Sequence, residues 1–227
     1  MKILLTGATG MVGQGVLREC LLASDVEQVI SLGRAPLGQT HAKLRDLVHK
    51  DLYDLAPIAK DLEGIDACLF CLGVSAAGMS EADYTKITYD LTLSVAKALL
   101  AASPKATFIY VSGESTDSTE KGSAMWARVK GRTENAILKL GFPKAFAFRP
   151  GYIQPLHGIK SRTFWYRVIY GVCGPFYPLL KKMAPKMVTN TEEVGRAMLR
   201  VVREGFGKPV VHTVDIGVLG GPREQER

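Results

Sequence analysis

Short apolar runs alternate with longer stretches of helical periodicity along the first 150 residues. The apolar runs predict strands at Lys2–Thr6, Val26–Leu32, Asp66–Leu72, Ala106–Val111 and Ala145–Phe148, with a short additional strand around Leu47–His49. Apolar residues at helical spacing predict helices at Met11–Leu22, Glu81–Ala102 and Gly122–Leu140. This alternation is typical of an α/β protein, so we expect a Rossmann-like doubly wound parallel sheet with helices on both faces.

The regular alternation ends at Pro150, after which glycine, proline and aromatic residues are concentrated. Glycine and proline interrupt regular elements, whereas aromatic side chains favour burial. Ligands of open α/β sheets bind beyond the carboxyl ends of the strands, so we expect the aromatic segment Phe164–Tyr177 to line or cover a substrate cleft. A further helix is expected to begin within Thr189–Glu193, with Thr189 or Thr191 as its cap.

We therefore predict one domain over residues 1–227, with a cofactor-binding core at 1–155 and a small C-terminal cap or substrate region, with the last helix and strand, at 156–227. Three alternatives to a cleft-covering role stay open for the aromatic segment. It could be a cap packed on the sheet edge, a dimer contact, or a patch that touches a membrane surface beside Lys181, Lys182 and Lys186.

Composition narrows the class of partner. Hydrophobic residues make up 47% of the chain and charged residues 22%, which excludes a disordered, collagen-like or coiled-coil chain. The formal net charge of +7 is scattered rather than clustered, so we expect a small-molecule substrate and no nucleic acid. No run of about 18 apolar residues exists, so no transmembrane span is predicted, although weak membrane-surface contact stays open. We expect a monomer or a homodimer.

The cysteines and histidines predict no metal site. Cys68 and Cys71 form a C-x-x-C pair, but they lie in an apolar strand, where side chains three apart point to opposite faces. The four histidines are far apart in the sequence and lack metal-ligand spacing. The cysteines suggest no disulfide framework, and the N-terminal apolar run is too short for a signal peptide. These features predict a cytoplasmic location.

The strongest local signal is the glycine loop Gly7-Ala-Thr-Gly-Met-Val-Gly13, which follows a predicted strand and opens a predicted helix. In a dinucleotide-binding loop, the first glycine allows a tight turn, the second lets the backbone approach a pyrophosphate, and the third lets helix and strand pack closely. The helix N-terminus then presents free N–H groups to the phosphates. We predict cofactor contacts from Gly7, Thr9, Gly10, Met11, Val12 and Gly13.

The end of the second strand indicates which dinucleotide binds. An acidic residue at this place would bind the ribose 2′-hydroxyl of NAD. The sequence there is Ser31-Leu-Gly-Arg34, without an acid. The guanidinium of Arg34 can instead bind a 2′-phosphate through a fork of donors, so NADP(H) is favoured over NAD(H).

Several motifs fall in the order seen in a known family. They are Thr6-Gly-Ala-Thr-Gly-Met-Val-Gly13, Asp51-Leu52, Cys71-Leu72-Gly73, Tyr110-Val-Ser-Gly113, Lys130-Gly131 and Arg149-Pro-Gly151. With them the chain resembles the short-chain dehydrogenase/reductase superfamily in its extended or atypical branch. It is most similar to the Tat-interacting-protein-like NAD(P)-binding oxidoreductases, through Val129–Gly131 and Thr189–Met198. The resemblance implies further cofactor contacts from Asp51, Leu52, Cys71, Leu72, Gly73, Val111, Lys130 and Pro150.

The resemblance also implies a catalytic Tyr-x-x-x-Lys pair and a serine, and here the sequence departs from the pattern. Lys130 matches the lysine that holds the nicotinamide ribose, but position 126 is Trp126, whose indole N–H is only a donor. Ser112 matches the serine position, with Ser115 as the alternative. Tyr152 and His157 are weaker candidates for a substitute proton donor.

Two functions therefore stay open. One is an NADP(H)-dependent oxidoreductase, or a nucleotide-sugar-type epimerase relative, acting on an unknown carbonyl or alcohol substrate. The other is a non-catalytic NADP(H)-binding sensor or protein-interaction module. Fold alone does not decide between them.

Overall fold

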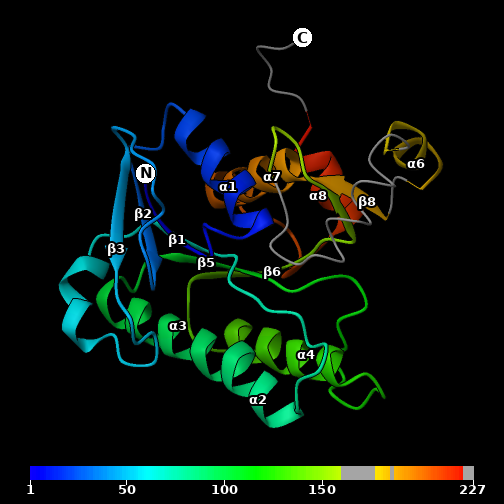
Figure 1. The fold of residues 1–227 in the computed structure, drawn as a ribbon, viewed down its shortest axis with the longest axis horizontal. Helices are drawn as coiled ribbons and strands as arrows, with labels where there is room; N and C mark the ends of the chain where they lie inside the picture. The colour runs from blue at the N-terminus through cyan, green and yellow to red at the C-terminus, as the bar shows by residue number, and fades with distance from the viewer. Residues whose placement is uncertain (160–176, 185–186, 222–227) are drawn as a thin grey trace.

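The computed structural model describes residues 1–159, 177–184 and 187–221. Within these residues, parallel strands form a seven-stranded sheet of order β3-β2-β1-β4-β5-β6-β9 (Figure 1). The strands are β1 (Lys2–Thr6), β2 (Gln28–Gly33), β3 (Leu44–Val48), β4 (Ala67–Phe70), β5 (Thr107–Val111), β6 (Lys144–Arg149) and β9 (Val210–His212). A small parallel sheet pairs β7 (Tyr152–Gln154) with β8 (Val188–Asn190).

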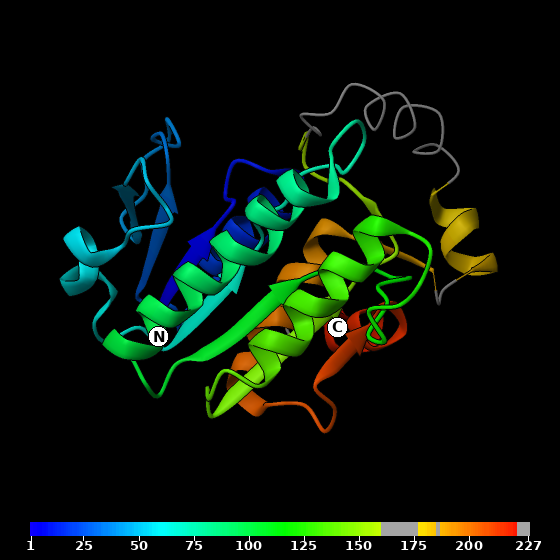
Figure 2. The same ribbon diagram turned by 90° about the horizontal axis from the view of Figure 1, so that it is seen from below.

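Helices cover both faces of the large sheet (Figures 1 and 2). One face carries α1 (Met11–Leu22), α7 (Thr191–Glu204) and α8 (Thr213–Leu219). The other carries the 3₁₀-helix η1 (Ala56–Leu62), α2 (Glu81–Thr85), the π-helical turn η2 (Lys86–Asp90), α3 (Leu91–Ala102) and α4 (Met125–Leu138). The short helix α6 (Tyr177–Met183) lies at one end of the molecule. The predicted doubly wound α/β fold is confirmed.

Alternation along the strands explains why the sheet is buried on both faces. On β1, Ile3 and Leu5 belong to the apolar cluster under α1 and α7, whereas Leu4 belongs to the cluster under α3. All three side chains have no exposed surface. Because successive side chains of a strand point to opposite faces, a parallel sheet between two helix layers needs apolar residues at every position.

The strand order indicates where a ligand would bind. From β1 the chain builds β2 and β3 on one side, and β4, β5, β6 and β9 on the other. The loops after β1 and β4 therefore diverge from neighbouring strands toward opposite faces. Ligands of open α/β sheets bind at such a switch point, outside the carboxyl ends of the strands.

Two predictions about helices need correction. The predicted helix over Glu81–Ala102 spans that range, but its middle is the π-helical turn η2, which a 3.6-residue pattern does not reveal. The cap of α7 is Asn190 rather than Thr189 or Thr191, because the Asn190 side chain accepts a hydrogen bond from the N–H of Glu193 at 2.8 Å.

Short elements escaped prediction, since three to seven residues show too little periodicity. They are η1, β7, β8, α6 and α8, whereas β9 is a last strand that we expect within 156–227 without bounds. Most of the aromatic segment falls in residues 160–176, outside the described residues, so its place at a substrate cleft stays a prediction. Among the described residues, no helix has both the length and the apolar character needed to cross a membrane.

Candidate functional site

The glycine loop lies at the switch point. Gly7 has φ +71°, a conformation that residues with a side chain rarely adopt. A Cβ atom at Gly7 would lie 2.6 Å from the backbone of Cys71 and Leu72. The loop after β1 therefore touches the loop after β4, and only glycine permits this contact.

The rest of the loop leaves a cradle of backbone groups. The N–H of Gly10 donates to the carbonyl of Gly7 at 2.8 Å and closes the turn. A Cβ at Gly13 would lie 2.1 Å from that same carbonyl oxygen, so α1 begins in direct contact with the end of β1. Gly10 is the N-cap of α1 and has no side chain to cover the amides of Met11 and Val12. This cradle fits a pyrophosphate, which the helix N-terminus attracts.

Arg34 and Asp51 follow two neighbouring parallel strands, β2 and β3. Arg34 follows β2, is exposed, and forms no ion pair within the described part of the chain. Asp51 follows β3 and accepts a hydrogen bond from the N–H of Tyr53 at 2.9 Å, while Leu52 is buried. Burial and the charge of Asp90 raise the pKa of Tyr53, and the charge of Arg34 opposes this rise.

Cys71, Leu72 and Gly73 continue from β4 beside the glycine loop. The N–H of Cys71 donates to the carbonyl of Thr6 at 3.2 Å, and Gly73 is exposed with open space around its Cα. Burial raises the pKa of the Cys68 and Cys71 thiols, so both stay protonated near neutral pH. No cluster of metal-ligating side chains is found among the residues that the structure describes.

Lys130 projects from α4 toward the end of β5. Its ammonium donates a hydrogen bond to the main-chain carbonyl of Ser112 at 2.5 Å. Burial lowers the pKa of Lys130 to about 8, and the charge of Glu134 partly opposes this effect. Trp126 is half-buried and lies one turn earlier on the same helix. Four residues advance a helix by about 400°, so the two side chains are only ~40° apart around the axis.

The serine hydroxyls do not contact the ammonium of Lys130. Ser112 is buried, and its hydroxyl donates to the carboxylate of Glu134, with the carbonyl of Phe148 at 3.1 Å as a second partner. Ser115 is exposed on a turn with φ +64°. The link between Ser112 and Lys130 therefore runs through the backbone carbonyl. Val111, the last residue of β5, is half-buried, and Pro150 after β6 is buried.

A buried ion pair behind this link was not among the predicted site residues. The Glu134 side chain is 1% exposed, and Arg149 binds both of its oxygens, with Nε–Oε1 and Nη2–Oε2 distances of 3.0 and 2.5 Å. Two sequence signals could have found the pair. Glu134 is four residues after Lys130, on the same side of the helix, and Arg149 opens the Arg149-Pro-Gly151 motif.

Tyr152 and His157 are engaged elsewhere. The Tyr152 hydroxyl donates to Oε1 of Gln154 at 2.7 Å, and His157 bonds to the carboxylate of Glu192 at the start of α7. Neither of these two hydrogen bonds involves Lys130 or Trp126.

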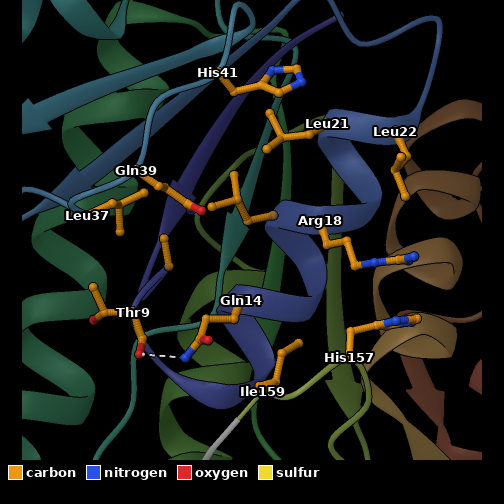
Figure 3. A pocket seen from close by; sticks show the side chains of 12 residues that line it. Thr9, Gln14, Arg18, Leu21, Leu22, Leu37, Gln39, His41, His157 and Ile159 are labelled. Atoms are coloured by element: carbon orange, nitrogen blue, oxygen red, sulfur yellow. Dashed lines mark hydrogen bonds between the residues drawn. The ribbon is translucent and has the colours of Figure 1, made fainter.

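A pocket of about 650 Å³ opens on the outer side of α1 (Figure 3). Ala8 and Thr9 of the glycine loop line one end, and His157 and Ile159 lie at its edge. Most of its apolar wall comes from leucines of α1 and from Leu37 in the loop after β2. Lys130 and Trp126 do not line it, because α4 covers the opposite face of the sheet.

Comparison with known proteins agrees with this geometry. Residues 3–122 match the NAD dependent epimerase/dehydratase family. The chain is 32% identical over 159 residues to "Protein fmp52, mitochondrial" of Emericella nidulans, covering 67% of this chain and 66% of that protein. It is 31% identical over 159 residues to "Protein fmp52-1, mitochondrial" of Aspergillus terreus, covering 67% of each. The matched part is thus about two thirds of these relatives.

A solved structure shares the fold over nearly the whole chain. It is an oxidoreductase of the short chain dehydrogenase/reductase family from Burkholderia thailandensis, with a TM-score of 0.65, 21% identity, and coverage of 99% of this chain and 95% of that one. The cytoplasmic prediction is wrong against the curated relatives, because both fmp52 proteins are named as mitochondrial.

Proposed function

Because the chain belongs to the NAD dependent epimerase/dehydratase family, we propose that it is an NADP(H)-binding, atypical short-chain dehydrogenase/reductase. Its substrate would be a small molecule with a carbonyl or alcohol group. The observation that carries the proposal is the glycine cradle at the switch point. Gly7 and Gly13 are in contacts that exclude any side chain, and the amides that follow Gly10 would bind a pyrophosphate.

Arg34 supports the preference for NADP(H). The β2 end supplies an exposed guanidinium and no carboxylate that could bind a ribose 2′-hydroxyl. Charge-assisted hydrogen bonds to a phosphate contribute about 1.5–3 kcal/mol. NADPH should therefore bind about 10–100-fold more tightly than NADH, since about 1.4 kcal/mol corresponds to a factor of ten.

Calorimetric titration with both cofactors tests this proposal. Arg34→Ala should weaken NADPH binding and leave NADH binding unchanged, so that the two affinities converge. Arg200→Ala is the matched control, because Arg200 is also exposed but lies near the end of α7, paired with Glu204. Equal affinity of the wild type for the two cofactors contradicts the NADP preference. No binding of either contradicts the proposed function.

The bound cofactor would supply a hydride to, or accept one from, the substrate carbon. Lys130 would hold the nicotinamide ribose: within the described residues its ammonium uses one N–H for Ser112, and its other N–H groups could bind a ligand. Trp126 would border the same space from one turn away. Its indole can donate a hydrogen bond to an oxygen but has no proton to transfer near neutral pH.

Trp126 also supports a second candidate function, a non-catalytic NADP(H)-binding sensor or protein-interaction module. If Trp126 stands where relatives use a tyrosine, the usual proton route is lost while cofactor binding through Lys130 is kept. A screen of carbonyl substrates under NADPH separates the two. Turnover supports the oxidoreductase, and tight cofactor binding without turnover of any substrate supports the sensor.

Three finer assignments complete the proposal. We place the chain in the Tat-interacting-protein-like group, on the motifs around Lys130 and in Thr189–Met198. The whole chain would act as one cofactor-binding unit, with its C-terminal region contributing to the substrate side. It would work as a monomer or a homodimer.

A further inference from the structure

Glu134 and Arg149 form a buried ion pair. Neither side chain has a direct role in the proposed mechanism. The Glu134 and Arg149 side chains are 1% and 11% exposed. Removing two charges from water is costly, and a buried pair often adds little net stability compared with apolar residues of similar size. Net stabilisation alone therefore does not account for the pair.

The pair is joined to Lys130 through a single residue. The Glu134 carboxylate accepts a hydrogen bond from the Ser112 hydroxyl, and the Ser112 N–H donates to the carbonyl of Phe148 at 2.9 Å. These bonds orient the Ser112 peptide, so that its carbonyl accepts a hydrogen bond from the Lys130 ammonium. Arg149, directly after Phe148 on β6, holds the carboxylate from the other side.

We propose that Glu134 and Arg149 are a positioning pair that, through Ser112, holds the Lys130 ammonium at the place where the cofactor ribose binds. The inference rests on the proposed function for the identity of the ligand. It assigns Ser112 a supporting place, in which the hydroxyl anchors the residue to Glu134 and the carbonyl orients the lysine.

The charges of the pair also affect the ionisation of Lys130. The charge that acts on Lys130 most directly is Glu134 on its own helix, and Arg149 on β6 neutralises Glu134. Tyr110 on β5 also faces Glu134, but burial raises the pKa of its phenol, so it stays neutral. Loss of the carboxylate would leave an unbalanced positive charge near the ammonium. Loss of the guanidinium would leave an unbalanced negative charge.

This arrangement predicts shifts of opposite sign. Glu134→Gln should lower the pH at which Lys130 loses its proton, and Arg149→Gln should raise it, each by about one pH unit, as expected for a nearby charge. The double variant should return close to the wild type, because both charges are then absent. A purely structural role would instead lower stability in both single variants without opposite shifts.

The direct readout is the titration of Lys130 itself. The protein is labelled with ¹³C at lysine Cε, whose chemical shift follows ionisation, and Lys130→Arg identifies the signal by its absence. The wild type, the two single variants and the double variant form a double-mutant cycle. The effect of removing each charge is therefore measured twice, once with the other charge present and once with it absent. If one single variant fails to fold, the other side of the cycle still gives the answer.

Glu19→Gln is the matched control. The Glu19 carboxylate is also 1% exposed and ion-paired, to Arg196 at 3.1 Å, but between α1 and α7. Glu19→Gln should lower the urea concentration at which half the protein is unfolded and leave the Lys130 titration unchanged. Opposite shifts in the Glu134 and Arg149 variants support the inference. Unchanged titration, or shifts of the same sign, overturns it.

A second measurement separates this inference from the proposed function. NADPH affinity of the wild type, measured against pH, should fall as Lys130 loses its proton, and its midpoint should move with the NMR titration in each variant. If the titration shifts as expected but NADPH affinity does not follow it, the positioning pair stands and the proposed contact between Lys130 and the cofactor is wrong.

Discussion

Replacing Lys130 with methionine should make the protein without cofactor more stable. In the folded state burial lowers the pKa of Lys130 from 10.5 to about 8. A change of one pKa unit corresponds to about 1.36 kcal/mol, so keeping this lysine charged in the folded protein costs up to about 3 kcal/mol at neutral pH. Methionine has a similar length and no charge to desolvate.

The dependence on pH gives the prediction its sign. Below the folded-state pKa of about 8, the lysine is charged in both states and the full cost is present. Between pH 8 and 10.5 the folded protein has lost the proton while the unfolded chain still binds it, so wild-type stability rises with pH. The advantage of Lys130→Met should therefore fall from about 3 kcal/mol at pH 7 to about 1 kcal/mol at pH 10.

Urea unfolding of both proteins at pH 7, 8, 9 and 10 measures this difference. Other groups titrate equally in the two proteins and cancel in the comparison. The same variant should lose NADPH affinity, so a stabilised protein that binds cofactor poorly is the expected result. An advantage that stays constant with pH would refute the reasoning, since it would come from packing alone. A less stable variant at pH 7 would also refute it, because the ammonium would then be well compensated.

The remaining predictions concern one glycine and one tryptophan. Gly131→Ala should destabilise the fold by about 1–3 kcal/mol in urea unfolding, because a Cβ there would lie 1.7 Å from the carbonyl oxygen of Asp117. Gly207→Ala, at a glycine with no atom near the added Cβ, is the control and should change stability by less than about 0.5 kcal/mol. Trp126→Tyr should raise NADPH-dependent carbonyl reduction by up to about 10²–10⁴-fold, the usual contribution of a general acid. A rate equal to that of the wild type would mean that the proton comes from another group.

The layered fold could be predicted from the sequence because its signals are local. A strand such as Lys2–Thr6 and a helix such as Met11–Leu22 carry their periodicity within a few turns, and both have the predicted bounds. The glycine loop between them has the same property, since a tight turn and a close helix start depend on neighbouring residues. The loop contacts the backbone of Cys71, which begins Cys71-Leu72-Gly73, another of the motifs identified in the sequence.

Bounds that depend on distant partners could not be predicted. A last strand is expected only somewhere within 156–227, and β9 lies at Val210–His212 because these residues pair with the edge of β6. The cap of α7 was placed on a threonine, although the neighbouring Asn190 supplies it. In both cases the sequence offered several equivalent choices, and packing against the rest of the chain selected one.

The candidate site divides in the same way. The sequence by itself determined the glycine loop between β1 and α1, the basic side chain at the end of β2, and a lysine with a tryptophan one turn before it on one helix. Only the tertiary structure decided that the Ser112 hydroxyl turns toward Glu134, and that Arg149 closes a buried ion pair behind Lys130. Hydrogen bonds between β5, α4 and β6 depend on the spacing and register of those elements. That register is set by the packing of the whole sheet, whereas periodicity reports only on neighbours along the chain.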